Sequence, residues 1–315
     1  MSGSVLVLGN FDGVHRGHQA VLRQARLMAD VQSLRCVVFT FDPHPSEVLG
    51  RGTLPKLTTL PRRVELLHRH GAANVVVEPF TMELAAWTPE RFAEDLLAQR
   101  LQARVVVVGG NFRFGNQRAG DFDLLAKLGK NLGFEAVASE VASDELGLFS
   151  STRARDAIAS GDLPAAENVL GRRHALSGAV ETGDQFGRTI GFPTANLGGV
   201  EEILPPHGVY AVVVDDVTSD LGAPTALAKG VMNIGKRPTV SKATATGLLA
   251  LRIEVHLFDH DRDIYGRALR VHLVRSLRPE QKFAGLDLLK AQIALDVDAA
   301  RSAAQGISPR GGAYG

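Results

Sequence analysis

Hydrophobic residues in the first half of the chain form short continuous runs, separated by stretches in which apolar residues recur every three or four positions. Runs of this kind predict strands buried on both faces, and the stretches between them predict amphipathic helices. The runs lie at residues 5–8, 35–40, 74–77, 104–108 and 134–138. Strands that alternate with helices are typical of α/β units, so we expect a parallel sheet wrapped by helices.

Past residue 172 the pattern changes to short alternating strands separated by turns rich in Gly, Pro and Asp. Strands are expected at residues 174–181, 208–214, 226–232, 249–257 and 268–273. This pattern predicts a small antiparallel β-barrel. Apolar residues return to helical spacing from Gly285 to Ala304, which predicts one closing helix, and the Gly-rich end is expected to be flexible. The expected domains are therefore 1–172 and 173–304, followed by a tail at 305–315.

Composition narrows the class of protein. A chain of 315 residues is long enough for two domains with separate cores, and a formal net charge of +1 argues against a broad nucleic-acid surface. Cys36 is the single cysteine, so no intrachain disulfide can form. The sequence shows neither a secretion leader nor an apolar run of membrane-spanning length. We therefore expect a cytoplasmic protein without membrane or nucleic-acid partners.

The first candidate site is the stretch from Gly9 to His18, GNFDGVHRGH, on the turn between the first strand and the first helix. Glycines such as Gly17 let the backbone approach a ligand, and the start of a helix favours a phosphate. His15 and His18 are three residues apart, so they share a helix face and can donate to one anion. One histidine alone would be interpreted as a surface residue of a glycine-rich turn, but the pair within this frame favours nucleotide binding.

Two further strands of the first half end in loops that mix aromatic and polar residues, namely 41–45 and 109–115. Ligands of such sheets collect at the carboxyl ends of strands, and a planar ring with a phosphate tail needs this mixture. Taken singly, Asp42 has a simpler interpretation as a turn residue and Phe112 as part of the core.

A third candidate follows in SSTRAR, residues 150–155. Ser151 and Thr152 are good helix caps, and a helix starting there would place hydroxyls, backbone donors and Arg155 around an anion. In isolation, an ordinary cap with solvent-exposed arginines would explain the same residues.

The second half contains GFPTANL at 191–197 and IEVHL at 253–257. Thr194 and Asn196 alternate with Ala195, so in an extended segment both oxygens point to one side, where they could bind a hard cation. Glu254 lies on the face opposite to Ile253 and its apolar neighbours. Without context, the first segment is a glycine-rich loop and Glu254 is a solvated residue.

Together these motifs resemble one family. The opening stretch resembles the G-x-F-D-G-x-H-x-G-H signature of nucleotidyltransferases, and the whole order is similar to the bacterial bifunctional riboflavin kinase/FMN adenylyltransferases, or FAD synthetases. Five further motifs of this family have counterparts here, and the likeness extends across about residues 4–298. These motifs are F-D-P-H-P, G-x-D/N-F-x-F-G, I-S-S-T-x-x-R, G-x-P-T-A-N and E-x-H-L. Asn111 stands where many relatives have Asp, and Phe149 replaces the usual Ile. Relatives also carry about a dozen residues before the first strand, so an N-terminal β element is expected to be missing.

For the first domain, the resemblance implies a Rossmann-like nucleotidyltransferase that adenylates FMN to FAD and releases pyrophosphate. His15, His18 and Arg155 are the implied catalytic contacts to the nucleotide phosphates. The implied ATP and phosphate contacts are Gly9, Phe11, Gly17, Ser151 and Thr152. The implied flavin contacts are Asp42, His44, Asn111 and Phe112.

For the barrel, the resemblance implies a riboflavin kinase that makes FMN. Thr194 and Asn196 would bind ATP and its Mg²⁺, with Mn²⁺ as the alternative, and Glu254 would be the general base for the riboflavin 5′-hydroxyl. The expected partners are riboflavin, FMN, FAD and ATP as co-substrate, and the oligomeric state is left open. Two rival hypotheses are a flavokinase whose front domain has another substrate or has decayed, and a noncatalytic flavin-binding regulator.

Overall fold

The computed structural model describes residues 3–140, 142–182, 187, 190–218, 223–236, 251–310 and 313–315. The chain forms two compact units, Met1–Thr152 and Arg153–Gly315, and each is described by itself. The predicted domain boundary at residue 172 lies later in the sequence than this division, and it stays a prediction.

The first unit is built on a five-stranded parallel sheet with the order β3-β2-β1-β4-β5. Its strands are β1 Ser4–Leu8, β2 Arg35–Phe41, β3 Asn74–Glu78, β4 Ala103–Gly109 and β5 Glu135–Ser139. Each predicted strand is present within a residue or two of its expected bounds, so the Rossmann-like α/β prediction is confirmed. Because β1 lies between β2 and β4, the loops that follow these three strands emerge side by side at one edge of the sheet.

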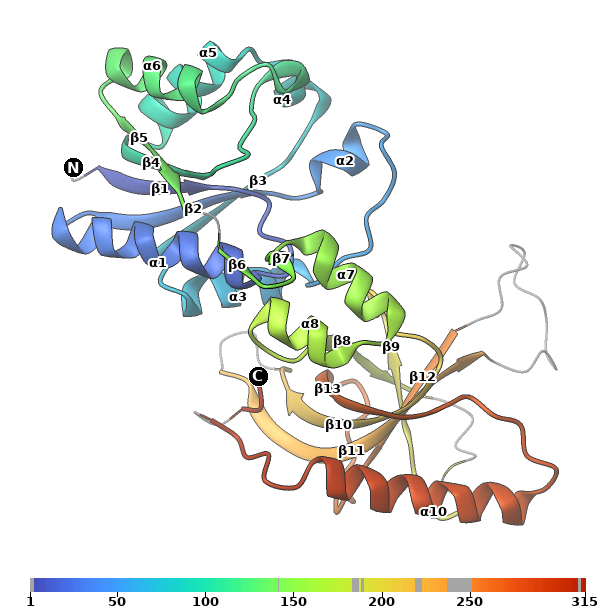
Figure 1. The fold of residues 1–315 in the computed structure, drawn as a ribbon. Coiled ribbons are helices and arrows are strands. Elements are labelled where there is room, and N and C mark those ends of the chain that lie inside the picture. Colours follow the sequence, from blue (N-terminus) through green and yellow to red (C-terminus); the bar gives the residue numbers. More distant parts are fainter. Residues whose placement is uncertain are drawn as a thin grey trace. The chain divides into compact units, whose positions relative to one another are not determined.

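Helices cover both faces of this sheet (Figure 1). Helices α1, Arg16–Val31, and α3, Leu60–Arg69, pack on the face that receives Val5 and Val7. The π-helix η1, Phe92–Arg100, and α6, Phe122–Leu132, pack on the face that receives Leu6 and Leu8. Consecutive residues of β1 thus enter opposite cores, which explains its unbroken apolar run. Cys36 is buried, and burial raises the pKa of its thiol to about 11, so it stays protonated.

Short elements complete this unit and lead into the next. They are α2 Pro45–Val48, α4 Met82–Ala85, α5 Pro89–Arg91, the 3₁₀ turn η2 Asn116–Arg118, and the hairpin strands β6 Ser143–Asp144 and β7 Gly147–Leu148. Helix α7, Ser151–Ser160, spans the division between the units, and α8, Leu163–Leu170, follows it.

The second unit is a closed antiparallel barrel with the order β10-β11-β12-β9-β8-β13, which confirms the predicted barrel. Its strands are β8 Ala175–Glu181, β9 Ala195–Gly198, β10 Gly208–Asp216, β11 Thr225–Lys236, β12 Leu251–Leu257 and β13 Ala268–Pro279. Residues 249 and 250 of the predicted fourth strand lie outside the described residues. Strand β9 was not among the predicted strands; it is short, and it pairs with β8 and β12 to close the barrel.

Helix α10, Leu286–Ala303, is the predicted closing helix, and it packs on the outside of the barrel near Val209, Ala211 and Val231. The end of the chain also contacts the barrel: Ala313 is buried, and the backbone N–H of Tyr314 donates to a carboxylate oxygen of Asp215 at 2.8 Å. Ala313 and Tyr314 are therefore in contact with the barrel. The flexibility of the tail in solution stays a prediction.

Candidate functional site

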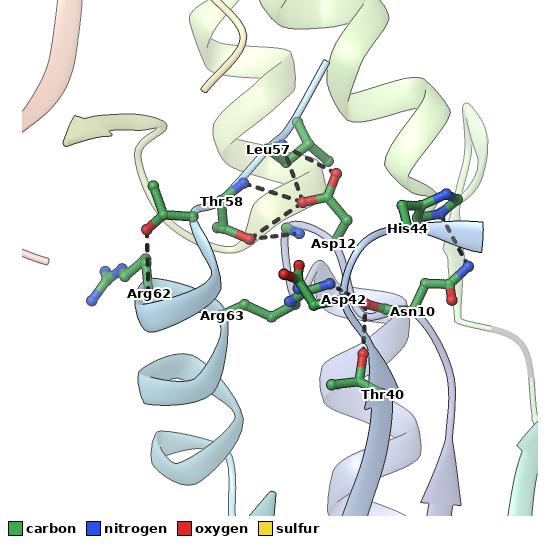
Figure 2. Close-up of polar contacts among 11 residues, drawn as sticks. Asn10, Asp12, Thr40, Asp42, His44, Leu57, Thr58, Arg62 and Arg63 are labelled. Carbon is green, nitrogen blue, oxygen red and sulfur yellow. Dashed lines mark hydrogen bonds and ion pairs between the residues drawn. The ribbon is translucent and has the colours of Figure 1, made fainter. Parts of the chain in front are cut away.

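The loop between β1 and α1 is held at the sheet edge by hydrogen bonds from neighbouring elements. The backbone N–H of Gly9 donates to the carbonyl of Phe39 at 3.2 Å. The carbonyl of Asn10 accepts from the hydroxyl of Thr40 at 3.0 Å and from Nη1 of the buried Arg63 at 3.1 Å (Figure 2). Strand β2 and helix α3 thereby hold the first residues of the GNFDGVHRGH stretch.

The two histidines of this stretch lie together at the start of α1. His15 is the N-cap of the helix, and its Nδ1 accepts from the backbone N–H of His18 at 3.4 Å. The two rings stack with their centroids 3.6 Å apart. The prediction that they share one face is therefore confirmed. Since Nδ1 of His15 accepts a hydrogen bond, the proton of a neutral His15 sits on Nε2.

His18 is held in its neutral form. Its Nδ1 is buried and has no hydrogen-bond partner among the residues that the structure describes. Burial first, and the neighbouring His15 second, place the pKa of His18 well below its ordinary value. The Phe11 ring lies 5.0 Å from the His18 ring and is only 2% exposed. Phe11 therefore supports His18, and only the Phe11 backbone is available to the nucleotide contact predicted for it.

This lowered pKa predicts how stability changes with pH. In the unfolded chain His18 takes up a proton near its ordinary pKa of 6.5, whereas in the folded protein the His18 ring stays neutral at that pH. The free energy of unfolding of the first unit should therefore fall as the pH drops through 6.5. Trp87, the single tryptophan, reports on this unit by fluorescence during urea unfolding at pH 5 to 8. His18→Gln should flatten the pH dependence, and an unchanged slope in this variant would contradict the lowered pKa.

The structure brings the predicted second phosphate motif to the same loop. The hydroxyl of Ser151 donates to the backbone carbonyl of Asp12 at 2.9 Å. A Cβ atom at Gly17 would lie 2.9 Å from the carbonyl oxygen of Phe149, so this close approach requires glycine. Ser151 and Thr152 are the first residues of α7 rather than its cap. Arg155 belongs to the other unit, and its position relative to the histidines stays a prediction.

The four predicted flavin residues follow β2 and β4, the two strands that flank β1. Asp42 forms an ion pair with Arg63 at 2.8 Å, and His44 contacts the Asn10 side chain at 3.0 Å while capping α2 (Figure 2). Asn111 is exposed. Phe112 is stacked on Phe114, with the ring centroids 5.5 Å apart. The structure thus gives Asp42 and His44 partners within the protein, and the flavin role of all four residues stays a prediction.

The barrel unit gathers the second set of predicted residues on its outer surface. The Thr194 hydroxyl donates to Oε1 of Glu254 at 3.2 Å, and Asn196 of β9 lies opposite Glu254 of β12 in register. Ala195 between them is buried in the barrel core. Ile253 is also in that core, so Glu254 points outward as predicted. Strand alternation thus places all three polar side chains on one side.

Sequence reasoning missed Arg252. Its Nη2 lies 3.0 Å from Oε1 of Glu254, and its Nε donates to Oδ1 of Asn196 at 3.3 Å. The spacing along the strand could have indicated Arg252, because a residue two positions before Glu254 lies on the same face of the strand. His256, two positions after Glu254, contacts the carbonyl of Pro193 at 2.7 Å and so holds the segment that carries Thr194.

A cavity of about 250 Å³ opens beside Glu254. Its apolar walls come from the barrel, from α10 and from the segment after β13, and they include Val209, Val231, Phe283, Leu289 and Ile293. Its polar lining includes Thr194, Asn233, Arg252, Glu254 and Glu280. Arg278 forms an ion pair with Asp296 of α10 at 2.7 Å, which ties two of the walls together. An apolar slot with a few polar groups at one end suits a planar ring with a polar tail.

A second cavity, of about 470 Å³, shares Thr194 with the first. It is lined on the other side by the 260–265 segment, in which Nε2 of His260 is buried without a hydrogen-bond partner among the described residues. A buried polar atom without a partner is uncommon in native structures unless a ligand or water satisfies it. Thr194 therefore separates two adjoining spaces, each with its own polar groups.

The residues present fit a magnesium ion. The hydroxyl of Thr194, the amide oxygen of Asn196 and the carboxylate of Glu254 are oxygen donors, which hard cations prefer. The described residues contain no group of three His, Cys, Asp or Glu side chains that could hold a metal. Mg²⁺ bound to a triphosphate needs no such group, because it commonly uses one or two protein oxygens together with phosphates and water.

Comparison with known proteins matches both units. The family model described as FAD synthetase matches residues 1–153, and the one described as riboflavin kinase matches residues 170–304. The bifunctional riboflavin kinase/FMN adenylyltransferase of Escherichia coli (strain K12) is 42% identical over 300 residues, covering 95% of this chain and 92% of the relative. That of Bacillus subtilis (strain 168) is 35% identical and covers 93% of this chain and 90% of the relative.

A crystal structure described as a macrolide-efflux protein from Streptococcus pneumoniae has a TM-score of 0.80 and 31% identity, covering 95% of this chain and 94% of its own. In the part of the chain that the structure describes, no helix is both long and apolar enough to span a membrane. Both family models, in this order, and the identity across nearly the whole chain lead to one conclusion: the chain belongs to the bifunctional riboflavin kinase/FMN adenylyltransferase family.

Proposed function

We propose that the two activities of this family are carried out at the two sites described above. The barrel unit phosphorylates riboflavin to FMN, and the α/β unit adenylates FMN to FAD. The observation that carries the assignment is the position of Thr194 between two adjoining cavities. Glu254, which accepts from Thr194 and pairs with Asn196 across the strands, lines the cavity that has the apolar walls of a flavin site. ATP is the co-substrate of both steps in this family.

In the kinase step, riboflavin occupies the cavity beside α10 and ATP occupies the one beside residues 260–265. Glu254, with its side chain 19% exposed, accepts the proton of the riboflavin 5′-hydroxyl as that oxygen attacks the γ-phosphorus. A bond forms between this oxygen and phosphorus while the bond to ADP breaks. Thr194 and Arg252 orient the carboxylate of Glu254, because both bind its Oε1 atom.

Thr194 and Asn196 are the residues that would hold Mg²⁺, with Mn²⁺ as the alternative. When bound, the ion shields the charge of the triphosphate. Asn196 also contacts Arg252, so a positive side chain adjoins the same donor set. The arginine brings further positive charge close to the place where the phosphates would bind.

In the adenylation step, a phosphate oxygen of FMN attacks the α-phosphorus of ATP and pyrophosphate leaves. The reaction needs no protein nucleophile, so the residues act by alignment and by offsetting negative charge. His15 and His18 donate to the phosphates from the start of α1, and Arg155 joins them. Gly9, Gly17, Ser151, Thr152 and the Phe11 backbone complete the phosphate contacts.

FMN is placed by residues of the two loops that flank the histidine loop, namely Asp42 and His44 after β2, and Asn111 and Phe112 after β4. What supports this is the sheet order, which puts these strand ends on either side of β1. We further propose a cytoplasmic location and no nucleic-acid partner, as the lone cysteine and the near-neutral charge favour.

The direct test is to incubate the purified chain with riboflavin, ATP and Mg²⁺ and to separate the flavins over time. FMN should appear first, and FAD should follow as FMN accumulates. FMN without FAD would favour a flavokinase whose front unit has another substrate. Bound flavin without turnover would favour a noncatalytic flavin-binding protein. Either of these outcomes contradicts the proposal.

A further inference from the structure

The loop that presents His15 has an unusual backbone. Phe11 has a φ of 53° and Val14 a φ of 39°, while Gly13 between them has a φ of 81°. Positive φ is uncommon for residues other than glycine, and it is a clear outlier for a β-branched residue such as Val14. Such a conformation persists only where the surrounding structure holds it in place. The contacts that hold this loop therefore decide where His15 and His18 lie.

Asp12 and Thr58 make those contacts. Asp12 is 8% exposed, and its carboxylate accepts from the backbone N–H groups of Leu57 at 3.1 Å and Thr58 at 3.2 Å. The Thr58 hydroxyl donates to the same carboxylate at 3.3 Å and accepts from the backbone N–H of Gly13 at 3.2 Å. Figure 2 shows the Asp12 side chain directed at the 57–58 segment. The strained part of the loop is thus tied, at Asp12 and at Gly13, to one short segment before α3.

Asp12 also connects this segment to the second phosphate motif. Its backbone carbonyl accepts from the Ser151 hydroxyl at 2.9 Å. One residue therefore contacts the 57–58 segment through its side chain and the start of α7 through its backbone. The family motifs include Asp12 and Ser151, whereas no sequence motif drew attention to Thr58.

We propose that Asp12 and Thr58 are positioning residues for FMN adenylation. Through their mutual hydrogen bonds they hold the histidines and Ser151 in the relative arrangement that the transition state requires. Neither needs to touch the substrate. Small displacements of groups that align reactants reduce the rate of the chemical step. Loss of the Asp12–Thr58 contacts should therefore lower kcat. This inference rests on the proposed role of His15 and His18.

The test compares Thr58→Val with Thr59→Val. Valine keeps the shape of threonine and removes the hydroxyl. Thr59 is the neighbouring residue, and its hydroxyl caps α3 by accepting from the Arg62 N–H. Thr58→Val should lower kcat for adenylation about 10- to 100-fold and change KM for ATP and FMN by less than about threefold. Thr59→Val should leave kcat within about twofold, and Thr58→Ser should restore it.

Unfolding of each variant is followed by Trp87 fluorescence, since this residue lies in the same unit. A loss of kcat equal in both valine variants would show general destabilisation and overturn the inference. So would a rise in KM at unchanged kcat, or no effect of Thr58→Val. His15→Asn distinguishes failure of the positioning role from failure of the proposed histidine site. If it abolishes adenylation while Thr58→Val does nothing, only the positioning role fails, and if His15→Asn is fully active, the proposed site fails.

Discussion

Glu254→Gln is expected to lower kcat for riboflavin phosphorylation by about 10²- to 10⁴-fold, the usual contribution of a general base. Glutamine keeps a carbonyl oxygen that can accept from Thr194, whose hydroxyl lies 3.2 Å from Oε1 in the structure. It removes the basic lone pair that would take the proton of the 5′-hydroxyl. Riboflavin binding, measured by the quenching of flavin fluorescence, should change little. The carboxylate accepts the proton only during the transfer of the phosphoryl group.

The matched control is Glu280→Gln. Glu280 lines the same cavity as Glu254, so both variants lose one negative charge from the same space. The control should retain phosphorylation within about tenfold. FMN adenylation, measured with FMN supplied, should be unaffected in both. If Glu254→Gln phosphorylates riboflavin at the native rate, another group accepts the proton and the assignment of the base is wrong.

The second large effect is expected at the histidine pair. Removal of one preorganised donor to a developing negative charge commonly lowers kcat by about 10²- to 10³-fold. His15→Asn is the sharpest variant, because asparagine is among the best N-cap residues and can replace the contact that His15 Nδ1 makes with the His18 N–H. The helix is preserved while the Nε2 donor is lost. His18→Gln should have a comparable effect on adenylation.

His68→Asn serves as the control for the histidine variants. His68 lies on the exposed side of α3 in the same unit and contacts the carbonyl of Ala72. It should leave adenylation unchanged. Riboflavin phosphorylation should continue in all three variants and produce FMN that accumulates in the two active-site variants. Loss of both reactions in folded protein would contradict the division of the two steps between the two units.

The paired outcomes also decide between the rival hypotheses. Selective loss of phosphorylation at Glu254 and of adenylation at His15 requires two working sites in one chain. A flavokinase with a decayed front unit would show only the first effect, and a noncatalytic flavin-binding protein would show neither.

Much of the site was predictable from residue spacing. The separation of His15 and His18 by three positions placed both on one helix face, and their rings do stack. The alternation of Thr194, Ala195 and Asn196 placed both oxygens on one side of a strand, with Ala195 in the core. Both predictions depend only on the repeat of a single element, which the local sequence sets.

The contacts between elements were not predictable in this way. The bond from Ser151 to the Asp12 carbonyl joins residues 139 positions apart, and the Thr58 contacts come from a segment without a recognisable motif. Arg252 was missed although it shares a strand face with Glu254, because an arginine at that position has no meaning until Asn196 is seen beside it.

The sequence by itself determined the strands of the parallel sheet, all strands of the barrel except β9, and the spacing of the histidine pair and of Thr194 and Asn196, because hydrophobic periodicity and local spacing follow from the geometry of single helices and strands. Only the tertiary structure decided which side chains meet, which of them are buried and what holds the strained histidine loop. Burial lowers the pKa of His18, and hydrogen bonds from distant segments keep Asp12 in place. Both effects depend on the packing of elements that lie far apart in the chain.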